Sequence, residues 1–264
     1  MEKNRRLIQS ISRASDILTI FVNERKPLGI TEFANRLHLP KTTIQSIVQT
    51  LEALGYLEKD PSLQKYRLGP MVFQLGMKYA TNMDLVTIGR VWAERLCFQF
   101  RQPVNIGMLV GDRVVIVMRV EPENRFMTYP QAGSVIPIHT TCIGKMLFAF
   151  LERSKADPIL DNYTFDRLTP NSITDPEEFS RELAKVREEK ISYDNQESVS
   201  GLAGIGGPIF NHTGQVIAAF ALTGDTEVID KGSEAIVNAV KDTSIQISMQ
   251  LGCDHSLLNG LHSR

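Results

Sequence analysis

The sequence has few cysteines, three among 264 residues, and it has no long apolar run. Cys97, Cys142 and Cys253 stand far apart, in a spacing that matches no zinc-binding pattern, and such isolated thiols suit a reducing cytoplasm. No stretch supplies the roughly 20 consecutive apolar residues of a membrane-spanning helix. Polar side chains interrupt residues 7–21, where a signal peptide would need its apolar segment. We therefore expect a cytoplasmic protein without a membrane partner.

Signatures of catalysis and of cofactor binding are also missing. No nucleophile elbow or kinase signature surrounds Cys142, His139 or Ser198, and the five histidines are too scattered in sequence to suggest a metal site. The glycine-rich stretch 201–207 lacks the Lys-Ser/Thr pair of a phosphate-binding loop, so a bulged strand is the simpler interpretation. Cys142 as a redox sensor is a minor alternative, which requires a lowered thiol pKa. We expect no catalytic residues, no cofactor and no metal.

Charge is unevenly distributed, although the whole chain has a formal net charge of −1. Residues 1–80 contain 12 Lys and Arg against 7 Asp and Glu, whereas the remaining residues contain 17 against 23. A basic segment joined to an acidic one is typical of a protein whose basic part binds a polyanion. The excess is small enough to fit ordinary variation, so this pattern alone leaves nucleic-acid binding open.

The first 70 residues have the pattern of three helices and a hairpin. Apolar residues recur at helical spacing over 11–21, and a short second helix is expected after Thr31 as its N-cap. The third helix is expected over 41–54, with Leu54 as the last residue of its buried stripe. A hairpin over 56–68 follows. Two short helices, a tight turn and a hairpin are the layout of a winged helix-turn-helix.

Short polar side chains on the third helix lie off its apolar stripe, which suits contacts with base edges and phosphates of double-stranded DNA. Basic residues on the first helix and on the hairpin are expected to reach backbone phosphates. A small three-helix module for protein interaction is the alternative. The candidate DNA-binding residues are Arg13, Lys41, Thr42, Thr43, Gln45, Ser46, Gln49, Lys65 and Arg67.

A linker helix is expected over 71–82, with an apolar side that either contacts a second subunit or packs within the chain. Residues 83–252 show helices and antiparallel hairpins in alternation, which indicates an α+β domain. Residues 253–264 are expected to form a loose tail. The expected helices of the domain lie at 84–102, 142–151, 176–190 and 229–251, and the expected hairpins at 104–120 and 205–222.

Several short motifs together resemble the isocitrate lyase regulator (IclR) family of bacterial transcription regulators. The resemblance implies a GAF-like effector-binding domain, assembly as dimers or tetramers, and control of a nearby catabolic operon, often by repression. An α+β enzyme and a protein-interaction adaptor remain the alternatives. The motifs are Leu39–Ile44, Gln49–Tyr56 and Tyr66–Gly69 in the DNA-binding part, and Ile138–Lys145, Asp194–Glu197, Gly201–Leu202 and Pro208–Phe210 in the C-terminal part.

The resemblance also implies a pocket for a small organic acid or for an aromatic or sugar-acid catabolite. Residues 142–144 would present backbone N–H groups at a helix N-terminus, which favours a carboxylate. Asp194 would orient a ligand hydroxyl or hold a backbone loop in place. The residues that match the family's effector positions are Cys142, Ile143, Asp194, Gly204, Ala221 and Thr223, and the expected helix N-terminus adds Gly144 to the candidate effector residues.

This sequence departs from the family pattern at several of these positions. Cys142 stands where a small residue is common, and Gly204 stands where a cysteine is common. Ala221 and Thr223 replace paired serines on the last strand. The third helix has Gln45-Ser46 where family members commonly have a His/Tyr-Arg pair. Neither the effector nor the operator sequence can therefore be transferred from the family.

Overall fold

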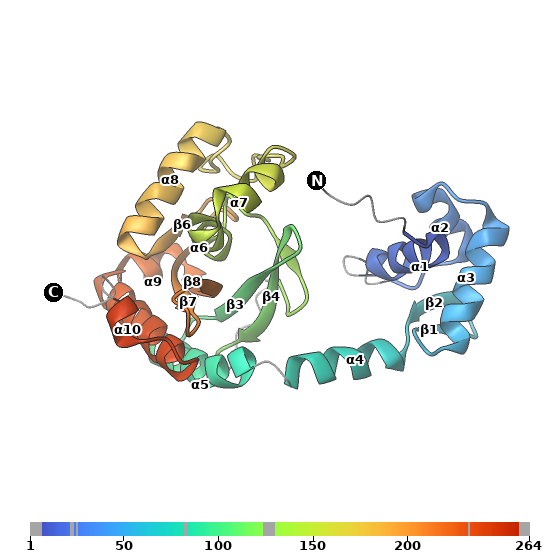
Figure 1. Ribbon diagram of the computed structural model, residues 1–264, viewed down its shortest axis with the longest axis horizontal. Helices are drawn as coiled ribbons and strands as arrows, with labels where there is room; N and C mark the ends of the chain where they lie inside the picture. Colours follow the sequence, from blue (N-terminus) through green and yellow to red (C-terminus); the bar gives the residue numbers. More distant parts are fainter. Residues whose placement is uncertain are drawn as a thin grey trace. The chain divides into compact units, whose positions relative to one another are not determined.

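The computed structural model describes residues 7–21, 24, 26–81, 84–123, 130–231 and 233–258 (Figure 1). The chain divides into two compact units, Met1–Asn82 and Met83–Arg264, each with its own hydrophobic core. The end of the expected linker at residue 82 and the last six residues of the expected tail lie outside the described residues. Within the described part, no helix combines the length and the apolar character needed to cross a membrane.

The N-terminal unit is a winged helix-turn-helix, as the sequence predicts. Its first three helices pack around side chains that have no exposed surface, including Ile17, Phe33 and Ile44. The two strands pair in antiparallel fashion, with Leu57 opposite Leu68. The elements are α1 (Gln9–Ile20), α2 (Ile30–Leu37), α3 (Lys41–Ala53), β1 (Leu57–Asp60), β2 (Lys65–Leu68) and α4 (Pro70–Thr81).

The second helix begins earlier than the sequence predicts. Gly29 occupies the N-cap position and α2 starts at Ile30, so the assignment of Thr31 as N-cap is wrong. The Glu32 carboxylate accepts a hydrogen bond from the Gly29 backbone N–H at 2.6 Å. This hydrogen bond satisfies the backbone N–H of Gly29, a donor at the helix start that has no acceptor within the helix.

The N-terminal unit leaves several large apolar side chains uncovered. Leu54 is 56% exposed and does not extend the buried stripe of α3, because the helix ends one residue earlier, at Ala53. Phe73, Leu75 and Met77 on α4 are also exposed. The packing within this unit therefore does not account for all of its apolar surface.

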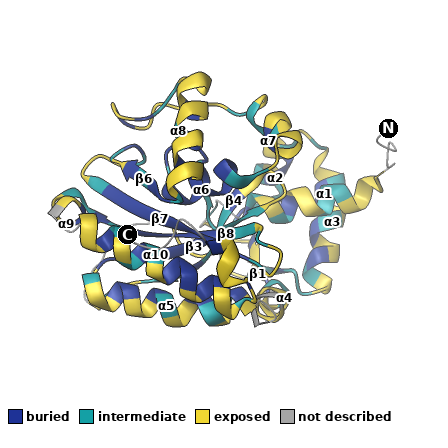
Figure 2. Cartoon of the chain, turned by 60° about the vertical axis from the view of Figure 1, so that its left-hand side comes forward, coloured by how far each residue is buried: buried dark blue, intermediate teal, exposed yellow. Residues whose placement is uncertain are grey.

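The C-terminal unit is an α+β domain built on one antiparallel sheet in the order β5-β4-β3-β8-β7-β6. The core on one face of the sheet includes side chains of α5 and α10, and the core on the other face includes those of α6 and α8. Figure 2 shows central strands buried beneath helices whose outer sides are exposed. The elements are α5 (Asp84–Phe100), β3 (Val104–Val110), β4 (Arg113–Val120), β5 (Val135–Ile136), α6 (Cys142–Phe150), α7 (Arg153–Leu160), α8 (Pro176–Glu189), β6 (Ser192–Asn195), β7 (Leu202–Phe210), β8 (Val216–Asp225), α9 (Thr226–Lys231), α10 (Ser233–Gln250) and the 3₁₀ helix η1 (His255–Leu258).

The end of the chain differs from the expected single helix and loose tail. Two helices, α9 and α10, lie on either side of residue 232, which is outside the described residues. Residues 253–258 are not loose, because Cys253 and Leu258 are buried against Phe210 and Ile245. Two apolar anchors five residues apart are enough to order this segment, and so short a pattern carries no clear period in the sequence.

Candidate functional site

The exposed side of α3 carries the polar residues predicted to contact DNA. Within the described residues, no hydrogen bond engages the side-chain amides of Gln45 and Gln49, so both are available to a ligand. Glutamine amides can bond to the major-groove edge of adenine. The exposed residues are Lys41, Thr42, Gln45, Ser46 and Gln49, and Thr43 is half-buried.

The two basic residues predicted on the hairpin are engaged in surface ion pairs. Lys65 Nζ lies 3.0 Å from a carboxylate oxygen of Glu32, and Arg67 Nε lies 2.5 Å from Oε1 of Glu58. Hydrogen bonds from the Gly29 N–H and from Lys65 hold the pKa of Glu32 below its usual value. Exposed pairs of this kind contribute only about 0–1 kcal/mol, so a DNA phosphate can replace either carboxylate at little cost.

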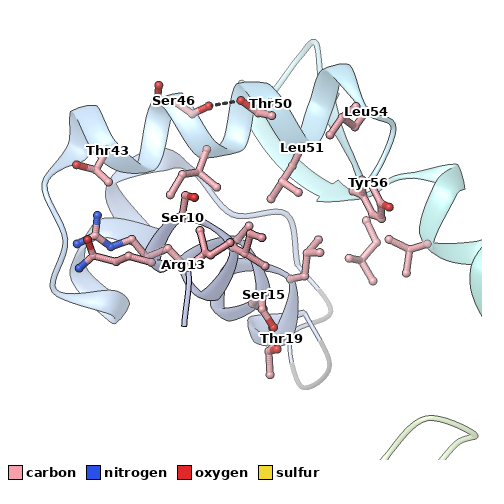
Figure 3. A pocket seen from close by; sticks show the side chains of 18 of the residues that line it. Ser10, Arg13, Ser15, Thr19, Thr43, Ser46, Thr50, Leu51, Leu54 and Tyr56 are labelled. Atoms are coloured by element: carbon pink, nitrogen blue, oxygen red, sulfur yellow. Dashed lines mark hydrogen bonds between the residues drawn. The ribbon is translucent and has the colours of Figure 1, made fainter. Parts of the chain in front are cut away.

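Arg13 lines an open groove between α1 and α3 of the same unit. Figure 3 shows Arg13 and Thr43 toward one end of the groove, and Leu54 and Tyr56 toward the other. The walls are largely apolar and include a residue of α4, Val72. The groove therefore lies beside the polar side of α3 and continues the uncovered apolar surface of the unit.

The C-terminal unit holds a pocket of about 180 Å³ at the N-terminal end of α6. Five of the predicted effector residues line it: Cys142, Ile143, Asp194, Ala221 and Thr223. They come from a helix and two separate strands, and most of the lining is apolar. The other lining residues are Asn105, Ile116, Pro130, Ile136, Pro137, Thr141, Leu168, Ser198, Val199, Leu202 and Ala203.

The start of α6 offers hydrogen-bond donors to this pocket. The Thr141 hydroxyl caps the helix, because it accepts a hydrogen bond from the Gly144 N–H at 3.1 Å and donates one to the Pro137 carbonyl at 2.7 Å. Within the described residues, the backbone N–H groups of Cys142 and Ile143 have no hydrogen-bond acceptor. Two free donors at the positive end of a helix dipole favour an anionic ligand group.

Gly144 and Gly204, the other predicted effector residues, do not line the pocket. A Cβ atom on Gly144 would lie 2.7 Å from the Pro137 carbonyl oxygen and closer still to that of Ile138. A Cβ atom on Gly204 would lie 3.0 Å from Cys142 Sγ. Both glycines therefore provide space for the backbone or side chains that build the pocket wall.

The glycine-rich stretch 201–207 also allows close packing against Cys142 of α6, and it contains no bulge. A Cβ atom on Gly206 would lie 2.8 Å from Cβ of Cys142 and from Oγ of Ser192. Pairing with β8 stays regular from Leu202 to Ile209, and the register shifts only after that residue. The expectation of a bulged strand over 201–207 is wrong: the pairing is regular, and Gly204 and Gly206 leave room for Cys142 of α6.

Asp194 is buried and its carboxylate holds the loop that follows β6. Oδ1 accepts hydrogen bonds from the backbone N–H groups of Glu197 at 2.7 Å and Ser198 at 3.3 Å. Oδ2 accepts one from the Ser198 hydroxyl. Burial raises the pKa of Asp194, and these hydrogen bonds oppose the rise. Of the two roles considered for Asp194, loop support has contacts in the structure, and the residue also borders the pocket.

A buried lysine near the pocket was not recognised from the sequence. Lys145 in α6 has no exposed surface, and its Nζ donates to Oε1 of Glu197 at 2.6 Å and to the Tyr193 carbonyl at 2.9 Å. Glu182 is a third partner at 3.5 Å. Burial raises the pKa of Glu197, whereas Lys145 lowers it. Lys145 lies within the apolar run of α6, and nothing near it in the sequence indicates that its partner is Glu197, 52 residues later.

Cys142 and His139 do not have the properties of reactive groups. Burial is the main cause that raises the pKa of the Cys142 thiol well above its usual value, and a redox sensor would need the opposite shift. His139 is buried, with Nδ1 2.7 Å from the Tyr163 hydroxyl and Nε2 2.9 Å from the Asp166 carbonyl oxygen. Burial lowers the pKa of His139, so a neutral ring that donates to this carbonyl fits both contacts.

Asn105 is a polar pocket residue that the sequence reasoning missed. Its Nδ2 donates to Oγ1 of Thr223 at 3.4 Å, and its Oδ1 accepts from Nη1 of Arg119 at 3.1 Å. The available signal was one amide that interrupts an apolar strand between Val104 and Ile106. Such an interruption does not show which face of the strand meets the pocket.

A winged helix-turn-helix joined in one chain to an α+β unit with a small pocket defines a class of protein, the transcription regulators controlled by a small molecule. The family model described as "IclR helix-turn-helix domain" matches residues 10–61. The model described as "Bacterial transcriptional regulator IclR C-terminal" matches residues 77–249. The chain belongs to the IclR family of bacterial transcriptional regulators.

Individual members are similar over nearly the whole chain. The transcriptional regulator XynR of Escherichia coli strain K12 is 29% identical over 93% of this chain and 98% of its own length. An IclR regulator structure from Alicyclobacillus acidocaldarius has a TM-score of 0.82 at 26% identity, over 93% of this chain and 100% of that one. An IclR homologue from Microbacterium hydrocarbonoxydans, solved with 4-hydroxybenzoate, shares the fold with a TM-score of 0.81 at 22% identity, over 92% and 99% of the two chains.

Proposed function

We propose that this regulator represses a nearby catabolic operon in the cytoplasm and that a small carboxylate in the C-terminal pocket controls its binding to the operator. The observation that carries the proposal is the presence, in one chain, of amides on α3 and backbone donors at the start of α6 that have no partner among the described residues. The amides suit base edges, and the donors suit a carboxylate.

The pocket supports a compact acid as the effector. Its volume of about 180 Å³ fits a small molecule, and the apolar lining leaves the α6 N-terminus as the main place for a charged group. The Microbacterium homologue binds 4-hydroxybenzoate. Aromatic acids, sugar acids and short organic acids are therefore the classes to test.

Fluorescence anisotropy of labelled DNA from upstream of the gene tests the function directly. We expect tight binding that survives scrambled competitor and weakens with rising salt, because Lys and Arg release counterions from phosphates. The same complex is then titrated with 4-hydroxybenzoate, benzoate, pyruvate and gluconate. Binding no tighter than that to scrambled DNA, after selection from random DNA as well, would contradict the regulator function.

Replacing Gln45 and Gln49 singly with alanine is expected to weaken operator binding by about 1–3 kcal/mol each, because each substitution removes a base-edge contact. Binding to scrambled DNA should change little. The matched variant Lys65→Ala is expected to weaken binding to all sequences and to reduce the salt dependence, because it removes a phosphate contact. Anisotropy at several salt concentrations separates the two patterns. If both glutamine variants bound the operator as tightly as the wild-type protein, base reading by these residues would be excluded.

The groove beside α3 supports self-association through the N-terminal unit. Exposed Ile8 and Ile11, near the start of α1, line the groove together with Leu54 and Leu68 of the same unit. Two copies of one exposed apolar surface can pair across a two-fold axis. A second copy bound in this way would supply the second recognition helix for a two-half-site operator.

Ile11→Glu is expected to lower affinity for a two-half-site operator at least about tenfold, because a charge in the paired groove opposes association. Affinity for a single half-site should stay the same. Asn35→Glu, an equal charge change at an exposed position of α2, is the control. Wild-type affinity of Ile11→Glu for both DNAs, measured by anisotropy, would exclude the groove as the interface.

A further inference from the structure

Residues 195–201, which begin with the last residue of β6, form one wall of the effector pocket. Ser198 and Val199 line the cavity, and Val199 is half exposed on its outer side. After Asn195, the segment contains only bends and turns. Its position therefore depends on contacts from its two ends and from neighbouring elements.

Contacts from one side come from the loop before α8. The Thr169 hydroxyl donates to the Gln196 carbonyl at 2.7 Å, and the Ser172 hydroxyl donates to the Glu197 carbonyl at 2.8 Å. Leu168 of the same loop lines the pocket. These neutral hydrogen bonds hold the outer edge of the segment.

Asp194 of β6 also holds the segment through the backbone N–H groups of Glu197 and Ser198, and a buried ion pair joins the segment to α6. Lys145 is one turn after Cys142 and Ile143, which line the pocket, and its charge meets Glu197 in the middle of the segment. Within the described residues, the second carboxylate oxygen of Glu197 has no partner. Its other oxygen accepts from the Asn195 N–H at 3.3 Å and from Lys145 Nζ at 2.6 Å, so the shorter, charge-assisted contact is the one that joins the segment to α6.

We propose that Lys145 and Glu197 are positioning residues of the effector site: their ion pair holds segment 195–201 closed over the pocket without touching the ligand. Closure shapes the wall formed by Ser198 and Val199 and keeps water from the start of α6. The meaning of this closure for regulation rests on the proposed function. The closure itself is a property of the free protein.

The thiol of Cys142 is a ready probe of closure, because it lines the pocket and is buried there. Cys97 lies in the core on the opposite face of the sheet, and Cys253 packs beside η1, so both serve as internal controls. Labelling of the full-length protein with N-ethylmaleimide, followed by peptide mass spectrometry, gives a separate rate for each cysteine. A buried thiol reacts only after local opening, so its rate follows the population of the open state.

In the double variant Lys145→Met/Glu197→Gln, we expect Cys142 to be labelled about tenfold faster, with Cys97 and Cys253 unchanged. Neutral replacement of both partners avoids an unpaired buried charge, which favours a folded variant. Glu197→Gln alone is the milder second variant, with a smaller increase expected at Cys142. Glu182→Gln removes a carboxylate from Lys145 without touching the segment, and Lys155→Met/Glu152→Gln removes an exposed ion pair at the start of α7; both should keep wild-type rates.

An unchanged Cys142 rate in the double variant would overturn the proposal. A parallel rise at all three cysteines would overturn it too, because that pattern reports general destabilisation. If the double variant does not fold, the Cys142 labelling rate is compared between Glu197→Gln and Glu182→Gln. Equal rates in the two variants would overturn the proposal. No effector and no DNA enter the measurement, so a failure of the proposed function would leave this result unaffected.

Discussion

Replacing Lys145 with methionine is expected to lower the free energy of unfolding of the C-terminal unit by about 3–5 kcal/mol. The substitution leaves the Glu197 carboxylate buried, 4% exposed, without the cation that compensates it. Chemical denaturation followed through Trp92, the one tryptophan of the chain, reports on this unit. The double variant with Glu197→Gln should recover most of the loss, because it removes the unpaired charge.

The defect of Lys145→Met should depend on pH in a defined direction. Burial already raises the pKa of Glu197, and loss of the nearby lysine removes the main opposing influence. A carboxyl group with a raised pKa in the folded protein contributes stability that is full below its unfolded pKa of about 4.3 and is lost as pH rises through the folded value. The defect should therefore be smaller at about pH 5 than at about pH 8. An equal defect at both pH values would mean that the loss comes from a contact that does not titrate, the hydrogen bond from Lys145 Nζ to the Tyr193 carbonyl.

Gly144→Ala is expected to destabilise the same unit by about 2–3 kcal/mol, because the new methyl group overlaps backbone. Its Cβ atom would lie 2.7 Å from the Pro137 carbonyl oxygen and from Cα of Ile138, and neither can move as a flexible side chain does. Calorimetry should show a lower unfolding temperature for the C-terminal unit. The start of α6 would also shift away from Pro137, which lines the pocket.

Gly76→Ala is the matched control, since Gly76 lies within α4 and a Cβ atom there would meet nothing within 4 Å. Alanine in a helix is favoured over glycine by about 0.5–1 kcal/mol, so this variant should be neutral or slightly more stable. If Gly144→Ala kept wild-type stability and lost only the effector response, Gly144 would serve ligand approach rather than packing.

Local patterns predicted the DNA-binding unit well because its elements are short and strongly periodic. The stripe of Ile44, Val48 and Leu51 identified α3, and the hairpin over 57–68 followed from its turn residues. The errors fell at element ends. Leu54 and Thr31 fit the pattern of their helices, but hydrogen bonds at the termini, which periodicity does not encode, set the boundaries.

The pocket was harder to predict because its walls come from distant parts of the chain. Resemblance to the family pointed to Cys142, Asp194 and Thr223, which do line the cavity. Asn105 was missed, although it bonds to a residue 118 positions later. Gly144 was placed in the site by its motif, whereas the structure puts it against backbone of the preceding loop.

The sequence by itself determined the two-part organisation of this protein, its winged helix-turn-helix and its membership of a regulator family, because helical period, turn residues and ordered motifs are local properties. Only the tertiary structure decided which polar groups are buried and what each one meets. Lys145 lies in an apolar helix, and its ion pair with Glu197, 52 residues away, offsets the cost of burying its charge. Burial and partnership arise when segments far apart in the chain pack together, so they can be read only from the folded molecule.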